Sequence, residues 1–148
     1  MGTVIELTGR LHPLVVHFPI AFLLGAAALE LARLRERWKN LDATIRILLW
    51  FGGIAALVAG GTGLIFMNDF APAPSERWML PWHRGLAIAG AIIAVLAAIV
   101  SKHVGHTDSR ASLHFRRFLT WSSATLIAIS AHFGALMVWG ADYYTAHY

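Results

Sequence analysis

The chain contains no cysteine and few charged residues, and each shortage excludes a class of protein. Without cysteine there is no disulfide, no thiolate metal site, no iron–sulfur cluster and no covalently attached c-type haem. Charged residues make up only 14% of the 148 residues, whereas a soluble domain carries about a quarter. Hydrophobic residues make up 57%. These proportions predict an integral membrane protein.

The apolar residues gather into four runs separated by short polar segments. Each run is close to the roughly 20 residues that an α-helix needs to cross the hydrocarbon core of a bilayer. Short connections make successive helices antiparallel. We therefore predict an all-α integral membrane four-helix up-down bundle that forms a single domain over residues 1–148. The predicted spans are approximately residues 14–32, 47–67, 83–101 and 118–139.

The basic residues are distributed unevenly between the two sides of this bundle. Nine of the twelve lie between the first and second spans or between the third and fourth. Basic loops stay in the cytoplasm, so both termini are predicted to be periplasmic in a bacterial inner membrane. A basic fringe beside anionic lipid headgroups accounts for the net charge of +4, and nucleic acid is not a predicted partner. The nine are Arg33, Arg35, Arg37, Lys39, Arg46, Lys102, Arg110, Arg116 and Arg117, and the other three are Arg10, Arg77 and Arg84.

Four histidines fall in the outer half of the predicted spans: His12, His17, His83 and His132. An imidazole inside hydrocarbon is costly unless it is paired or coordinated. Small residues share a helical face with His17, with His83 and with His132, which predicts that these faces pack against other helices. Several imidazoles at one depth predict a bound cofactor or metal.

Haem b is the cofactor that this arrangement favours, because facing helices of a bundle can supply its axial histidines. We predict His17 and His132 as the axial pair, since they are the two deepest histidines and their helices are neighbours in an up-down bundle. His83 is the substitute for His17 in this pair. His12 then serves as a partner of the propionates or of the ligands, and Arg84 lies where propionates would favour a positive charge.

Two other classes of function are open from the residues alone. A copper or zinc site would use His17, His132 and His83, with His12 as a fourth nitrogen and Met79 or Met137 as soft ligands for Cu(I). Proton relay is a further role for such histidines. A cofactor-free structural subunit of a larger membrane complex is the other class.

Motifs of a stand-alone enzyme are missing from the sequence. There is no nucleophile elbow, no phosphate-binding glycine loop and no pair of catalytic carboxylates. We therefore predict an electron-transfer protein or an accessory subunit. Its predicted partners are the lipid bilayer, other subunits of a redox complex and a quinone.

Two features of the spans give further predictions. Span two is rich in glycine, which predicts close helix contact and a loss of packing when Gly60 or Gly61 becomes leucine. Glu30 is the only acid within a span. We expect it to reach the cytoplasmic edge or to pair with Arg33 or Arg37.

The histidine motifs carry a resemblance to a known family. The first span opens with His12-Pro13-x-x-Val16-His17-Phe18-Pro19-Ile20, the third opens at His83, and the fourth contains His132-Phe133-Gly134. In these motifs the chain resembles the domain-of-unknown-function 2231 family of bacterial four-helix membrane proteins, over residues 11–144. The resemblance implies a membrane protein associated with haem or with redox partners such as cytochromes, and no established enzymatic activity.

Overall fold

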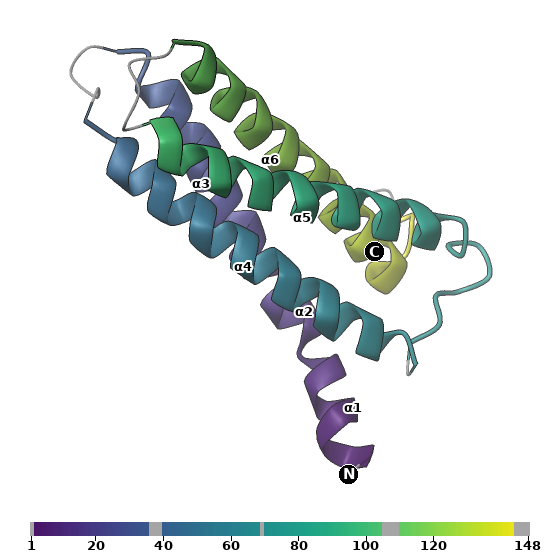
Figure 1. Ribbon diagram of the computed structural model, residues 1–148. Coiled ribbons are helices and arrows are strands. Elements are labelled where there is room, and N and C mark those ends of the chain that lie inside the picture. Colours follow the sequence, from purple (N-terminus) through teal and green to yellow (C-terminus); the bar gives the residue numbers. More distant parts are fainter. Residues whose placement is uncertain (1, 36–39, 69, 105–109, 144–148) are drawn as a thin grey trace.

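The computed structural model describes residues 2–35, 40–68, 70–104 and 110–143, and the regular structure within them is helical (Figure 1). Four helical segments are long and apolar enough to cross a membrane: His12–Ala32, Asp42–Phe66, Met79–Val104 and Arg110–Trp139. The predicted all-α class is thereby confirmed. The helices are α1 (Gly2–Arg10), α2 (His12–Val15), α3 (His17–Ala32), α4 (Asp42–Phe66), α5 (Met79–Val104) and α6 (Arg110–Trp139).

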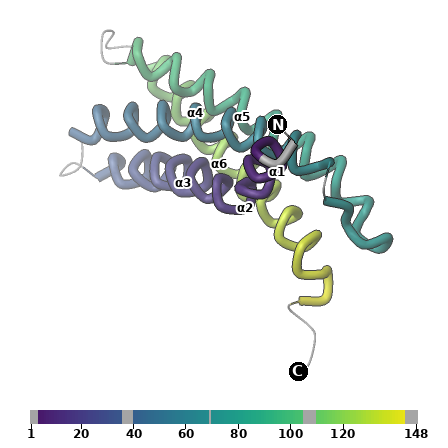
Figure 2. The backbone as a smooth tube through the Cα atoms, turned by 90° about the horizontal axis from the view of Figure 1, so that it is seen from below, coloured from purple at the N-terminus to yellow at the C-terminus, as the bar shows by residue number. Residues whose placement is uncertain are grey.

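The four long helices form an up-down bundle. Each of α3, α4 and α5 packs against the next in the chain, and α3 also packs against α6, which closes the ring. The first and last spans are therefore neighbours, as predicted, while α3 and α5 stand across the bundle from each other. Figures 1 and 2 show that the helices diverge towards one end.

The two ends of the bundle differ in character. The end that carries α1, α2 and the start of α5 contains His12 and His83, and we call it the histidine end. The opposite end contains Arg33, Lys102 and Arg116, and we call it the basic end.

The helices extend beyond the predicted spans at the basic end. The fourth begins at Arg110 and not at 118, and the second begins at Asp42 and not at 47. Three of the charged residues in these added turns, Asp42, Arg116 and Arg117, form ion pairs inside the bundle. Arg116, for example, is 1% exposed and contacts Asp42.

The segment before the first predicted span is also helical. Helix α1 packs against α4, and α2 lies between α1 and α3 (Figure 1). Gly9 permits the close approach, because a Cβ there would lie 2.9 Å from Ile65 Cγ2. Pro13 has no N–H and cannot bond to the carbonyl four residues back, which is a physical reason for the irregular backbone between α1 and α3.

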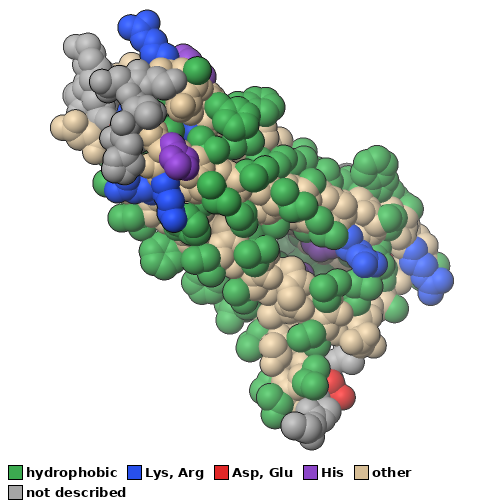
Figure 3. Space-filling model, in the orientation of Figure 1, with side chains coloured by type: hydrophobic (Ala, Val, Ile, Leu, Met, Phe, Trp, Pro, Cys, Tyr) green, Lys and Arg blue, Asp and Glu red, His purple; other side chains and the backbone are tan. Residues whose placement is uncertain are grey.

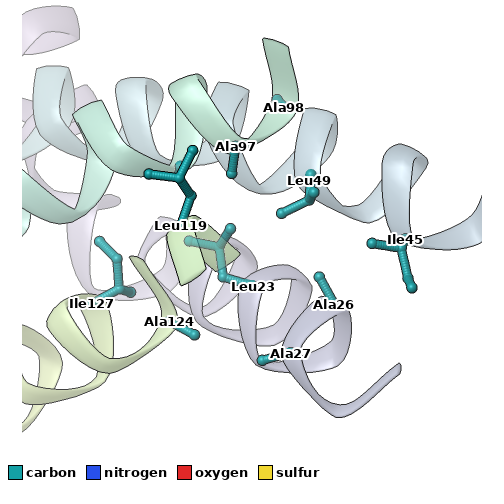
Figure 4. Packing of buried hydrophobic residues seen from close by; sticks show 11 residues of the cluster. Leu23, Ala26, Ala27, Ile45, Leu49, Ala97, Ala98, Leu119, Ala124 and Ile127 are labelled. Carbon is teal, nitrogen blue, oxygen red and sulfur yellow. The ribbon is translucent and has the colours of Figure 1, made fainter. Parts of the chain in front are cut away.

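Alanines dominate the core, which lies between the four long helices (Figure 4). Small side chains let helices approach closely in a membrane, where packing and not water exclusion drives association. Large apolar side chains instead cover the outer surface (Figure 3). The buried apolar cluster consists of Leu23, Ala26, Ala27, Ile45, Leu49, Ala94, Ala97, Ala98, Leu119, Ala124 and Ile127.

The packing prediction for span two is wrong at Gly60 and Gly61. Both residues are exposed, and a Cβ on either would meet no atom within 4 Å. The face of α4 that packs against α3 carries Gly52 instead, where a Cβ would lie 2.7 Å from Leu23 Cδ2. Composition places glycines in this helix, but it does not tell which of its faces points to lipid.

Candidate functional site

Two histidines meet at the histidine end of the bundle. The rings of His12 from α2 and His83 from α5 have centroids 6.4 Å apart and planes at 82°. Both side chains are half-buried. The first and third spans, which face each other across the bundle, thus each contribute one imidazole to the same place.

His12 is held by α4 through one nitrogen of its ring. Its Nδ1 lies 3.0 Å from the Ala59 carbonyl oxygen and 3.2 Å from the hydroxyl of Thr62. The Thr62 hydroxyl donates its own proton to the Ala59 carbonyl, at 3.0 Å. Both neighbours of Nδ1 are therefore acceptors, which assigns the proton to Nδ1 and the lone pair of the neutral ring to Nε2. The ring also stacks on Phe66, with centroids 6.0 Å apart.

His83 is held by α6 in the same manner. Its Nδ1 donates to the Ser130 carbonyl at 2.8 Å. The Ser130 hydroxyl lies 3.2 Å from that nitrogen and donates to the His83 carbonyl at 2.8 Å. The lone pair of neutral His83 is thus also on Nε2. In both rings the anchored nitrogen is Nδ1, so Nε2 is the nitrogen whose lone pair could bind a metal.

Glycines make room for both rings. A Cβ on Gly63 would lie 2.8 Å from Cε1 of His12, and a Cβ on Gly134 would lie 3.1 Å from Cε1 of His83. No side chain larger than hydrogen fits at Gly63 without displacing the imidazole. Figure 3 shows histidine side chains at the bottom of a hollow, with a basic side chain beside it, where α4 and α5 separate in Figure 1.

The two histidines predicted as an axial pair do not lie on buried helix faces. His17 and His132 are both exposed, as are Ala21 on the face of His17 and Thr125 on the face of His132. His17 Nδ1 lies 3.3 Å from the Leu14 carbonyl of its own helix segment. The prediction of their burial is wrong, because small residues at helical spacing here point outwards.

The other predicted ligands are placed as follows. Arg84 is exposed and directly follows His83 in α5. Met79 and Met137 are buried, at 3% and 8% exposure. Within the part of the chain that the structure describes, no three His, Asp or Glu side chains are arranged to hold one metal ion.

Sequence reasoning missed the hydroxyl partners of the two imidazoles. Thr62 is the polar residue in the run Gly60-Gly61-Thr62-Gly63. Ser130 lies two residues before His132. A hydroxyl surrounded by glycine within an apolar span is a signal that could have indicated Thr62. Nothing in the local sequence connects Ser130 with His83.

A second polar cluster, also missed, lies at the basic end. Arg116 Nε donates to Glu30 Oε1 at 2.7 Å, and its Nη1 donates to Asp42 Oδ1 at 2.8 Å. Arg117 donates to the other Glu30 oxygen at 3.1 Å, and Arg33 pairs with Asp42 at 2.7 Å. We call these five residues the charge cluster. It connects α3, α4 and α6.

The expected partners of Glu30 are only partly correct. Arg33 lies near Glu30, but at 3.9 Å, and Arg37 falls outside the described residues. The closest contacts come from Arg116, 86 residues away in the chain. Glu30 is 2% exposed, so its side chain is enclosed by the bundle.

Gly63→Ala is expected to destabilise the protein, while Gly60→Ala is not. The added methyl group at 63 meets a ring that two hydrogen bonds hold in place, whereas the methyl group at 60 meets nothing within 4 Å. Overpacking costs about 1–3 kcal/mol. Thermal denaturation followed by circular dichroism checks this, and equal midpoints for the two variants would contradict the close contact between Gly63 and His12.

The family comparison covers almost the whole chain. The family described as a predicted membrane protein, DUF2231, matches residues 9–147, which include His12, His83 and their partners on α4 and α6. Comparisons with curated proteins and with solved structures find no match. The chain therefore belongs to the DUF2231 family of predicted membrane proteins.

Proposed function

We propose that the protein is a membrane b-type haem protein in which His12 and His83 are the axial ligands. The observation that carries the proposal is the meeting of these two rings with both Nδ1 atoms anchored on other helices. Two imidazoles that bound one metal through Nε2 at about 2.0–2.1 Å would have ring centroids roughly 6.3 Å apart. The observed separation of 6.4 Å is compatible with that requirement.

The surroundings support the same ligand pair. Hydrogen bonds from Nδ1 to a carbonyl fix the orientation of each ring and raise the basicity of Nε2. Both anchors, at Ala59 and Ser130, belong to helices other than those that carry the histidines. Arg84 places a positive charge beside His83, where it can pair with a propionate.

Haem would supply one-electron redox chemistry. The chain would position it at one end of the bundle, with helix carbonyls and hydroxyls setting the direction of its ligands. Such a site is suited to electron transfer at the membrane surface, with another subunit of a redox complex or a quinone as the partner. Electron transfer and not catalysis by the chain itself is the activity that we propose.

The absorption spectrum of the purified protein tests this proposal. We expect a Soret band in the oxidised protein and sharp α and β bands after reduction with dithionite. Metal in stoichiometric amount without a Soret band would support a copper or zinc protein instead. A folded protein with neither would support a structural subunit, in which the two histidines only connect α2 to α4 and α5 to α6.

We further propose that the histidine end faces the periplasm of a bacterial inner membrane. Nine of the twelve basic residues lie between the first and second predicted spans or between the third and fourth, on the side opposite the histidine end. Basic loops stay in the cytoplasm. Because the chain lacks cysteine, Ser75→Cys and Arg35→Cys each introduce a single thiol. A membrane-impermeant maleimide added to whole spheroplasts should label position 75 and not 35. Labelling of position 35 alone would show that the basic end, and not the histidine end, faces the periplasm.

A further inference from the structure

A groove at the basic end lies on the outside of the bundle, between α4 and the end of α5. Its volume is about 520 Å³, which is within the range of small-molecule sites. One side comes from the first turns of α4 and the other from the last turn of α5. The lining residues are Arg46, Ile47, Trp50, Phe51, Lys102 and His103.

The groove combines cations with apolar and aromatic surface. Lys102 Nζ lies 4.8 Å from the centre of the Trp50 ring, a cation–π contact that positions the ammonium group at the rim. Ile47 and Phe51 are 53% and 56% exposed and continue the groove as apolar surface along α4. A ligand that fits this surface has an anionic head and a hydrocarbon body.

The positive charge of the groove comes from Arg46 and Lys102. Among the described residues, no carboxylate forms an ion pair with Arg46 or Lys102. The charge cluster differs, because Glu30 and Asp42 bind its arginines there. Two cations without an acidic partner in the described part of the chain therefore lie beside a hydrophobic surface at one end of the membrane spans.

We propose that this groove binds one anionic phospholipid. Arg46 and Lys102 contact the headgroup phosphate through charge-assisted hydrogen bonds, and an acyl chain lies against Ile47 and Phe51. Basic pockets between spans at a membrane surface are suited to such headgroups. The lipid would connect α4 to α5 at the basic end. This proposal is independent of the haem at the other end of the bundle.

Native mass spectrometry of the full-length protein in detergent tests the site. Phosphatidylglycerol and phosphatidylcholine with identical acyl chains are titrated separately, and the first bound lipid is quantified. We expect wild type to prefer phosphatidylglycerol. Arg46→Gln/Lys102→Gln should lower this preference on the order of tenfold. The matched control, Arg35→Gln/Arg110→Gln, removes two exposed basic residues at the same end and should retain it.

Three results of this titration would overturn the proposal. One is an unchanged preference in Arg46→Gln/Lys102→Gln, and another is an equal loss in the control. The third is displacement of the lipid by millimolar glycerol phosphate, which would indicate a site for free phosphate. A second measurement uses phosphatidylglycerol with brominated acyl chains, which should quench more fluorescence in wild type than in Trp50→Phe. Equal quenching in the two proteins would place the lipid elsewhere.

Discussion

Replacement of His12 or His83 by alanine is expected to abolish the low-spin haem spectrum. Each variant removes one of two axial nitrogens, and the remaining ring cannot form a six-coordinate centre alone. Loss of a partner that only orients a ligand already lowers metal affinity about 10–100-fold, so loss of a ligand should lower haem content at least as much. The measurement is the reduced-minus-oxidised spectrum with a haem assay on each purified variant.

The matched controls are His17 and His132, the other two histidines predicted in the outer half of the spans. His17→Ala and His132→Ala change exposed side chains, so both should retain the wild-type spectrum. If instead these two lose the haem and His12→Ala keeps it, the axial pair is His17 and His132. Added imidazole separates a ligand from a structural role, because it should restore a low-spin spectrum to His12→Gly or His83→Gly. Failure of both rescues in folded protein would contradict the assignment.

The bundle was predictable because its determinants are local. Four apolar runs of spanning length fix the helices, and short connections make them antiparallel, which also makes α3 and α6 neighbours. The ends of the helices were not predictable in this way. Hydropathy alone begins the fourth span after Arg116 and Arg117, because charged residues are costly in a membrane. Helix α6 instead begins at Arg110, because Glu30 and Asp42 contact those two arginines.

The predicted burial of His17 is wrong for a geometric reason. His12 and His17 are five residues apart, which corresponds to about 140° around a helix. Only one of the two can therefore face the middle of the bundle. Depth and small neighbours favoured His17, but the structure turns His12 inwards and His17 outwards. Rotation of a helix about its own axis depends on every contact along it, and α1 with its packing against α4 was not foreseen.

The partners of the site and of the charge cluster are distant in sequence. His83 and Ser130 are 47 residues apart, and Glu30 and Arg116 are 86 apart. Helical spacing reports only neighbours three or four residues away, which is why Arg33 was expected and Arg116 was not. Such pairs follow from the register between helices, which a single sequence leaves undetermined.

That buried ion pair gives the second large expected effect, on stability. Glu30→Gln should lower the free energy of unfolding by about 3–5 kcal/mol, because it leaves Arg116 charged and without its main carboxylate. The side chains of Glu30 and Arg116 are 0% and 1% exposed, so water cannot replace the lost partner. Arg116→Met should cost a similar amount by leaving the carboxylate of Glu30 with only Arg117 and the more distant Arg33.

The double variant Glu30→Gln/Arg116→Met decides whether the cost comes from an unpaired charge. Replacing both partners removes the buried charges together, so its loss should be smaller than the sum of the two single losses. Arg110→Gln is the control, since Arg110 is exposed at the start of α6 and should change stability by no more than about 0.5 kcal/mol. Denaturation in detergent with increasing dodecyl sulfate measures all four variants. Additive losses would show that Glu30 and Arg116 act independently, and a small effect of Glu30→Gln would show that water reaches the pair.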